Sequence, residues 1–185
     1  ATGYGIYKGY YSELSDLEFG EMFAGGIATA VKAYKTSGSE MASAISALGG
    51  TATSANVPLE EQLSVLGMLQ ATMSGSEAAT KYKALLNAAT GAGEKLGLNF
   101  LDANNQLRSL PEILGILKGK YGDTIDAVEK KQIKEAFGSD EAVAVIDLLY
   151  GKTGELQTGI LDMYDALGGG SSAAQEMATA INATE

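Results

Sequence analysis

The 185-residue sequence contains no cysteine and no histidine. Without cysteine the chain has no disulfide, no thiolate nucleophile and no zinc–thiolate site, and its redox compartment cannot be read from cysteine usage. Without histidine it has no Ser–His or Cys–His relay, no imidazole metal ligand and no side chain with an ordinary pKa near neutrality. These two absences exclude most common catalytic constellations, and no catalytic, cofactor-binding or metal-ligating residue is expected.

Basic residues are scarce relative to acidic ones. The chain has 13 lysines and arginines against 23 aspartates and glutamates, which gives a formal net charge of -10. The resulting pI is near 4.5. A surface built to neutralise nucleic-acid phosphates carries the opposite balance, so direct nucleic-acid binding is not expected.

Long hydrophobic runs are also missing. No apolar run approaches the ~20 residues that a helix needs to cross a bilayer, so the sequence predicts no membrane segment. The chain opens on Ala1 rather than on methionine, and the residues that follow carry no helix-start signal. We therefore expect a fragment of a longer protein.

Glycine, by contrast, is abundant. It supplies 24 of the 185 residues, nearly double the average usage of about 7%. Most glycines fall between segments in which apolar residues recur every three or four positions, the period of an amphipathic helix. With 45% hydrophobic residues, the chain can form one compact core or two small ones. We predict an all-α fold, a multi-helix bundle of about seven to nine short amphipathic helices, with one small β-hairpin near residues 98–107.

Several helix ends can be placed from local signals. Ser109 followed by Glu112 matches the capping-box pattern, so a helix should begin there. Ser76 and Ser139 are candidate N-caps, each followed by an acid that suits the positive end of a helix. The pair Gly25–Gly26 should break or kink the first long helix.

The adjacent acids Glu60 and Glu61 invite comparison with glycosidases, which need two carboxyl groups at a defined separation. Neighbouring residues of a helix diverge by ~100°, so the two acids do not converge on one bond. We interpret them as a solvated pair in the first turn of a helix. Glu77 and Glu94 could face other acids after folding, but no motif places an active site at either residue.

Asp102, Asn104 and Gln106 alternate like the opening of a calcium loop. Such a loop needs glycine at its sixth position, but that position is occupied by Leu107. It needs glutamate at its twelfth position, which is occupied by Ile113. The segment therefore indicates a turn rather than a calcium site.

Five lysines make the middle of the chain locally basic. Solvated helix faces explain this clustering, while a docking surface for an acidic partner is the alternative. The residues are Lys118, Lys120, Lys130, Lys131 and Lys134.

The first eleven residues form a separate aromatic N-terminal arm, distinct from a helical module over residues 12–185. The arm carries Tyr4, Tyr7, Tyr10 and Tyr11. These rings can close over the edge of the domain's own core, or they can mediate self-association by docking on a neighbouring subunit, since tyrosine supplies much contact area at small entropic cost.

Four blocks of sequence, in the same order, resemble the conserved region of phage and prophage tail tape-measure proteins. They are residues 57–63 (VPLEEQL), 66–78 (LGMLQATMSGSEA), 118–123 (KGKYGD) and 134–142 (KEAFGSDEA). Ala79 stands where the family pattern suggests glycine, a change that a helix interior tolerates. The matching motifs are helix boundaries and core faces, so the role of Gly75, Ser76, Gly138 and Ser139 is expected to be architectural.

The resemblance implies a structural protein that sets tail length during assembly in the host cytoplasm, occupies the lumen of the tail tube in the virion, and leaves ahead of the genome during ejection. It also implies contacts with tail-tube, assembly-chaperone or baseplate proteins and requires no cofactor. Two alternatives stay open: a carboxylate-dependent peptidoglycan hydrolase fragment, and an unrelated acidic helical adaptor.

Overall fold

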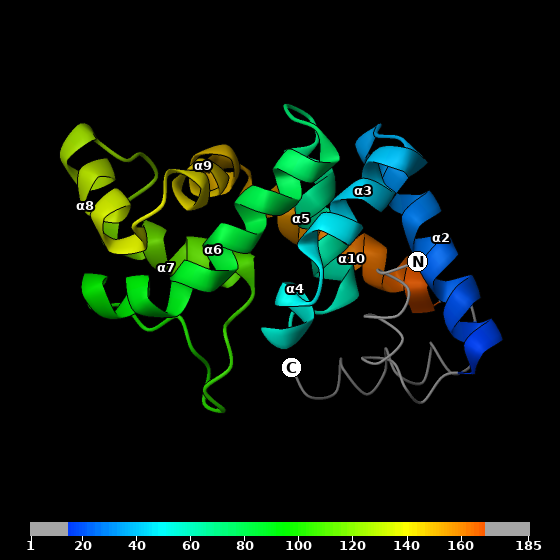
Figure 1. Ribbon diagram of the computed structural model, residues 1–185. Helices are drawn as coiled ribbons and strands as arrows, with labels where there is room; N and C mark the ends of the chain where they lie inside the picture. The colour runs from blue at the N-terminus through cyan, green and yellow to red at the C-terminus, as the bar shows by residue number, and fades with distance from the viewer. Residues whose placement is uncertain (1–14, 169–185) are drawn as a thin grey trace.

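The computed structural model describes residues 15–168, and within them the chain is a bundle of helices (Figure 1). The helices are α2 (Asp16–Tyr34), α3 (Gly38–Leu48), α4 (Thr51–Ser54), α5 (Leu59–Leu69), α6 (Gly75–Leu96), α7 (Leu110–Tyr121), α8 (Ala127–Phe137), α9 (Asp140–Leu149) and α10 (Thr153–Gly168), with a 3-10 turn at Tyr150–Lys152. This part of the chain contains no β-strand. The predicted all-α multi-helix fold is confirmed.

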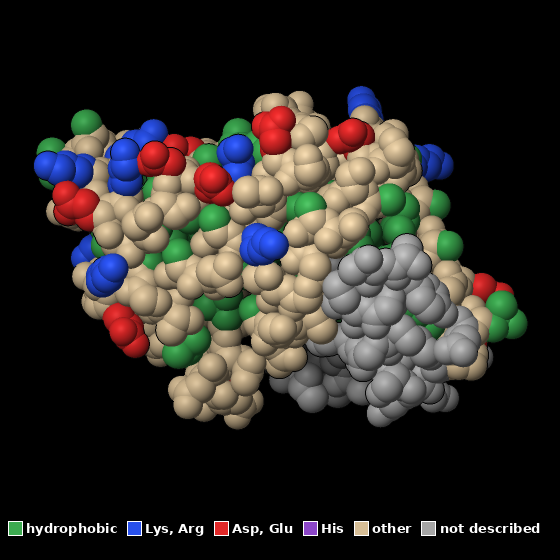
Figure 2. All heavy atoms as spheres, in the orientation of Figure 1, with side chains coloured by type: hydrophobic (Ala, Val, Ile, Leu, Met, Phe, Trp, Pro, Cys, Tyr) green, Lys and Arg blue, Asp and Glu red, His purple; other side chains and the backbone are tan. Residues whose placement is uncertain are grey.

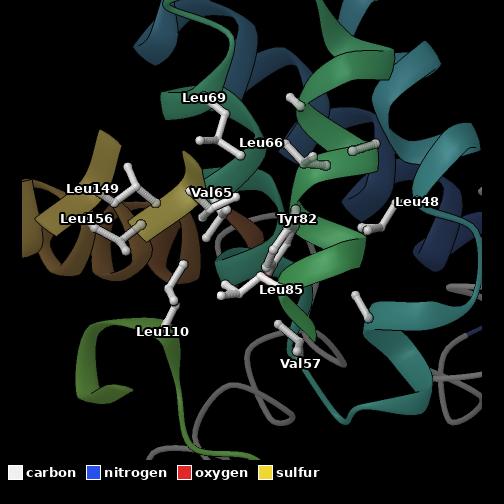
Figure 3. Close-up of a cluster of buried hydrophobic side chains, with 14 of the residues drawn as sticks. Leu48, Val57, Val65, Leu66, Leu69, Tyr82, Leu85, Leu110, Leu149 and Leu156 are labelled. Carbon is white, nitrogen blue, oxygen red and sulfur yellow. The ribbon is translucent and has the colours of Figure 1, made fainter. Parts of the chain in front are cut away.

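Helix α6 runs through the middle of the bundle and joins its two ends (Figure 1). Helices α2, α3 and α4 lie toward one end, and α7, α8 and α9 lie toward the other. After α9 the chain returns as α10, which packs against α5 and α2. Segments from both halves of the sequence therefore share one hydrophobic cluster, which includes Leu66, Tyr82 and Leu156 (Figure 3).

Helix α5 is the most enclosed element. All of its residues except Met68 are buried, because α2, α3, α6 and α10 surround it. Leu59, Leu63 and Leu66, which recur at the spacing of a helical turn, are all buried. The helix, however, has no solvated face, and its polar residues are buried with its leucines.

The capping predictions are confirmed at two helix starts and wrong at one. Ser109 and Glu112 form the capping box that begins α7, and the Ser139 hydroxyl accepts a hydrogen bond from the backbone of α9. The N-cap of α6 is Ser74 rather than Ser76, since the Ser74 hydroxyl accepts from the Glu77 backbone N–H at 3.3 Å. Ser76 lies inside the first turn.

Of the predicted break or kink at Gly25–Gly26, the break is wrong, because α2 continues through both residues. A Cβ added at Gly26 would lie 2.7 Å from Cδ2 of Leu167 and 3.2 Å from Cδ1 of Leu63. Gly26 therefore lets α10 and α5 approach α2. Tertiary packing along this face offsets the weak helix propensity of the two glycines.

The expected hairpin is reduced to an isolated antiparallel bridge between Leu101 and Leu107. Within the connecting turn, the Asp102 carboxylate accepts hydrogen bonds from the backbone N–H groups of Asn104 at 2.8 Å and Gln106 at 3.0 Å. These bonds are those of an Asx turn. The predicted turn in this segment is confirmed.

Gly75 has a role that the sequence did not indicate. It lies where α6 begins against α3, and a Cβ placed on it would lie 2.9 Å from the Glu40 carbonyl carbon and within 3.0 Å of the Glu40 carbonyl oxygen. The Gly75 N–H also donates to the Glu40 carboxylate at 2.6 Å. Gly75 thus sets the closest approach of two helices, in addition to standing at a helix start.

Candidate functional site

A groove of about 770 Å³ lies between α2, α5 and α10. Its apolar lining includes Tyr34, Met68 and Met163. Among its charged residues, Lys35 and Lys152 are balanced by two acids of α10, Glu155 and Asp162, and all four are exposed. The groove is thus mixed in character and has no net charge.

The Tyr34 ring lies between two helices that offer glycine at the points of contact. A Cβ added at Gly67 would lie 2.5 Å from Cγ of Tyr34, against the ring itself. A Cβ added at Gly159 would instead lie within 3.0 Å of the Tyr34 hydroxyl oxygen, with Cζ at 3.4 Å. Two glycines from α5 and α10 therefore make the slot that holds one tyrosine of α2.

The hydroxyl end of this slot is polar. Burial raises the pKa of the Tyr34 phenol above its ordinary value of 10.0, a hydrogen bond with the Ser64 side chain opposes the shift, and the charge of Asp162 adds to it. Ser64 is itself fully buried and donates to the Glu60 carbonyl at 2.8 Å. Tyr34 is therefore a neutral phenol at physiological pH, and the slot works as a packing feature that ties α2 to α5 and α10.

The interpretation of Glu60 and Glu61 as a solvated pair is wrong. Their exposed fractions are 5% and 4%, because the helices around α5 cover its first turn as well as its apolar stripe. One oxygen of the Glu61 carboxyl accepts a hydrogen bond from the Leu110 backbone N–H at 3.0 Å. Burial raises the pKa of Glu61 to about 8, and the charges of Glu60 and Glu112 add to the shift, while the bond from Leu110 opposes it.

The burial of Glu60 and Glu61 also counts against the hypothesis of a peptidoglycan hydrolase. A polymeric wall substrate cannot reach a carboxyl group that is 4% exposed. Glu77 and Glu94 are exposed, but they are near opposite ends of α6, a separation of about 25 Å at 1.5 Å per residue. The structure brings none of these acids together around an accessible bond. In the described residues no cluster of acids could hold a metal ion.

The lysine cluster is largely engaged within the chain. Lys130 pairs with Asp147 at 2.9 Å and Lys134 with Asp140 at 3.0 Å. Lys118 lies over the ring of Tyr150. On the face shown in Figure 2, basic and acidic side chains alternate over this end of the molecule. The arrangement favours solvated helix faces over a docking surface for an acidic partner.

The tyrosines of the predicted arm, Tyr4, Tyr7, Tyr10 and Tyr11, lie outside the described residues. Self-association through them stays a prediction. Within the described residues, the features that sequence reasoning missed are the Tyr34 slot and the buried Glu61. The only local signal for the slot is a glycine inside a helical pattern, at Gly67 and again at Gly159, which points to close packing.

Comparison with family models decides what kind of protein this is. The model of the phage-related minor tail proteins matches residues 13–138, more than half of the chain. The chain belongs to this family. Neither the curated proteins nor the solved structures contain a match to the chain.

The match to the phage-related minor tail proteins begins just before α2 and ends one residue after α8. It therefore includes α5, the start of α7 and the Glu61 contact between them. Membership supports a structural role in the phage tail, a location in the tail of the virion and contacts with other tail proteins. It suggests a structural rather than an enzymatic protein. Over residues 15–168, no helix is both long and apolar enough to cross a membrane.

Proposed function

We propose that the chain is a globular module of a tail tape-measure protein. The full protein sets tail length during assembly in the host cytoplasm, occupies the lumen of the tail tube and leaves ahead of the genome during ejection. Membership of the phage-related minor tail family supports the tail part of this proposal. The four sequence blocks that resemble tape-measure proteins support the rest.

The observation that carries the proposal is the closed packing of the described residues. The longest described helix, α6, has 22 residues and spans about 33 Å. A continuous helix of 185 residues would span about 280 Å. Instead, α10 folds back on α5 and α2. We therefore assign length counting to a different part of the same protein and a compact role to this module.

In this proposal residues 12–185 form the module and residues 1–11 form an aromatic arm that reaches a neighbouring chain. The partners are tail-tube, assembly-chaperone or baseplate proteins. No cofactor is needed. Neither remaining alternative gains support. Glu60 and Glu61 are buried, Glu77 and Glu94 are near opposite ends of α6, and the family match argues against an unrelated adaptor.

Tail lengths measured by electron microscopy test both parts of the proposal. The gene is altered in two ways: codons for residues 15–168 are deleted in frame, or a helical segment is inserted elsewhere. The insertion should lengthen tails by about 1.5 Å per residue, and tails of unchanged length would contradict the tape-measure assignment. The deletion should shorten any tails that form by much less than the roughly 230 Å that 154 helical residues would span. Shortening by that full amount would show that this segment is part of the ruler.

A further inference from the structure

The groove between α2, α5 and α10 opens onto the one part of α5 that the surrounding helices leave uncovered. Met68 is half-buried, whereas the other residues of α5 are buried, and it lines the groove together with the exposed Ala71 just after this helix. The walls carry small residues, among them Ala33 on α2 and Gly154 on α10. A Cβ on Gly154 would meet nothing within 4 Å. Small walls around a thioether leave room for an aromatic ring, and methionine sulfur makes favourable contacts with such rings.

The charged residues around the groove are unpaired within the described part of the chain. They are Lys35, Lys152, Glu155 and Asp162. Within residues 15–168 none of the four forms an ion pair. By contrast, two lysines of α8 pair with acids of α9. The groove therefore offers two cations and two anions to a ligand that carries both signs.

The first 14 residues of the chain, which include the aromatic arm, carry matching chemistry. They contain four tyrosines and one side-chain charge of each sign, at Lys8 and Glu13. A tyrosine ring presents a large apolar surface with a polar tip, which suits a groove lined by methionine and rimmed by charged residues. The two charges of the segment complement the two signs at the groove.

The backbone at Tyr10 and Tyr11 cannot reach the groove of its own chain. These residues lie five and four positions before Ser15, the N-cap of α2, a reach of at most about 18 Å. The first residue of α2 that lines the groove is Thr29, which is about 21 Å from Ser15 along the helix. Only the two earlier tyrosines have enough chain to span that distance. The groove of a second copy is open to all four.

The contact area also favours a second copy. A buried tyrosine contributes about 150–250 Å², so four tyrosines in the groove and along its rims bury about 600–1,000 Å². A stable interface buries about 800 Å² on each partner. Two tyrosines would supply only about 300–500 Å². The whole arm, rather than its first half, therefore provides the area that an interface needs.

We propose that the groove binds the aromatic arm of a second copy of this chain, with arm tyrosines against Met68 and Tyr34 and with Lys8 beside the acids of α10. This inference rests on the proposed function only for the arm that reaches a neighbouring chain, and not on the tape-measure assignment. The arm precedes the start of α2 and the groove lies toward the end of α2, so the contact is head to tail. Repeated head-to-tail contacts join copies into a ring or a filament.

Disulfide trapping between two single-cysteine chains tests this contact, since the chain has no cysteine of its own. One full chain carries Gly5→Cys, between Tyr4 and Tyr7 of the arm. The other carries Thr158→Cys on the groove wall, or Gln157→Cys, which is also exposed but does not line the groove. Neighbouring helix positions point about 100° apart, so only the Thr158 position faces the arm. Under mild oxidation, the mixed dimer should form at least about tenfold faster with Thr158→Cys than with Gln157→Cys.

Changing all four arm tyrosines to serine in the Gly5→Cys chain should remove the difference between the two positions. Equal rates for Thr158→Cys and Gln157→Cys with the tyrosines in place would overturn the proposal. An arm held by its own chain, or docked elsewhere on the neighbour, gives that result. A difference that survives the serine changes would also overturn it. Tail length does not enter this test, so its failure leaves the tape-measure assignment standing, and failure of that assignment leaves the groove contact standing.

Discussion

Gly75→Ala should destabilise the chain by roughly 2–3 kcal/mol, the cost of overpacking at a site that cannot relax easily. The added methyl group would meet the backbone of Glu40, so no side-chain rotation can relieve the contact. Moving α3 away would also stretch the bond between the Gly75 N–H and the Glu40 carboxylate, which is now 2.6 Å. Urea unfolding followed by circular dichroism measures the change.

Gly91→Ala is the matched control in the same helix. Gly91 is exposed, and a Cβ on it would meet nothing within 4 Å. Alanine should therefore stabilise α6 by about 0.5–1 kcal/mol, as expected for glycine replaced inside a helix. The two glycine-to-alanine changes should thus have opposite signs. If both variants gained stability, α3 and α6 could not approach each other at Gly75 as the structure describes.

Gly159→Ala should cost about 1–3 kcal/mol, and Tyr34→Phe should remove most of that cost. The alanine methyl would overlap the Tyr34 hydroxyl, whereas Cζ of the ring is already at an ordinary contact distance of 3.4 Å. Phenylalanine lacks only the overlapping atom. Tyr34→Phe alone should cost about 1 kcal/mol, because the hydrogen bond with Ser64 is lost.

Gly67→Ala provides the contrast within the same slot. Its methyl would overlap the ring carbons of Tyr34, including Cγ at 2.5 Å, and phenylalanine keeps those carbons. A double-mutant cycle from denaturant unfolding should show coupling of about 1 kcal/mol or more between Tyr34→Phe and Gly159→Ala. It should show little coupling with Gly67→Ala. Equal coupling for both glycines would mean that the hydroxyl is not seated against Gly159.

The helix ends show which features could be predicted from sequence. At Ser109 the serine and an acid three residues later define the start of α7 without reference to the rest of the fold. The same spacing would have selected Ser74 over Ser76, since Glu77 lies three residues after Ser74. Ser76 is adjacent to Glu77, whereas a serine cap accepts from the backbone N–H of the residue three positions later, which for Ser74 is Glu77.

Burial around α5 could not be predicted in the same way. Glu60 and Glu61 follow Pro58, and such acids usually occupy the solvated first turn of a helix. Helices from distant parts of the chain, among them α10, cover these two acids. The residues next to Glu61 in the sequence do not indicate that distant helices will bury it. The raised pKa of Glu61 can therefore be inferred only from the folded structure.

The glycines also differ in whether their roles could be predicted from the local sequence. Gly122 and Gly138 stand just after helices with φ values of 82° and 65°, a left-handed conformation that favours glycine, and their role as helix ends was predictable. Gly67 and Gly159 are inside helices and make the slot for Tyr34. Their role depends on the Tyr34 ring, which comes from a third helix. The residues around Gly67 and Gly159 in the sequence do not indicate that this ring will pack there.

Small-angle X-ray scattering of the chain in solution tests the central claim, that this segment is a closed module rather than an extended ruler. A compact chain of 185 residues should have a radius of gyration of about 16 Å, raised by a few ångströms if its ends extend from the bundle. A rod-like particle with a radius of gyration near 80 Å, as for a helix about 280 Å long, would contradict the account.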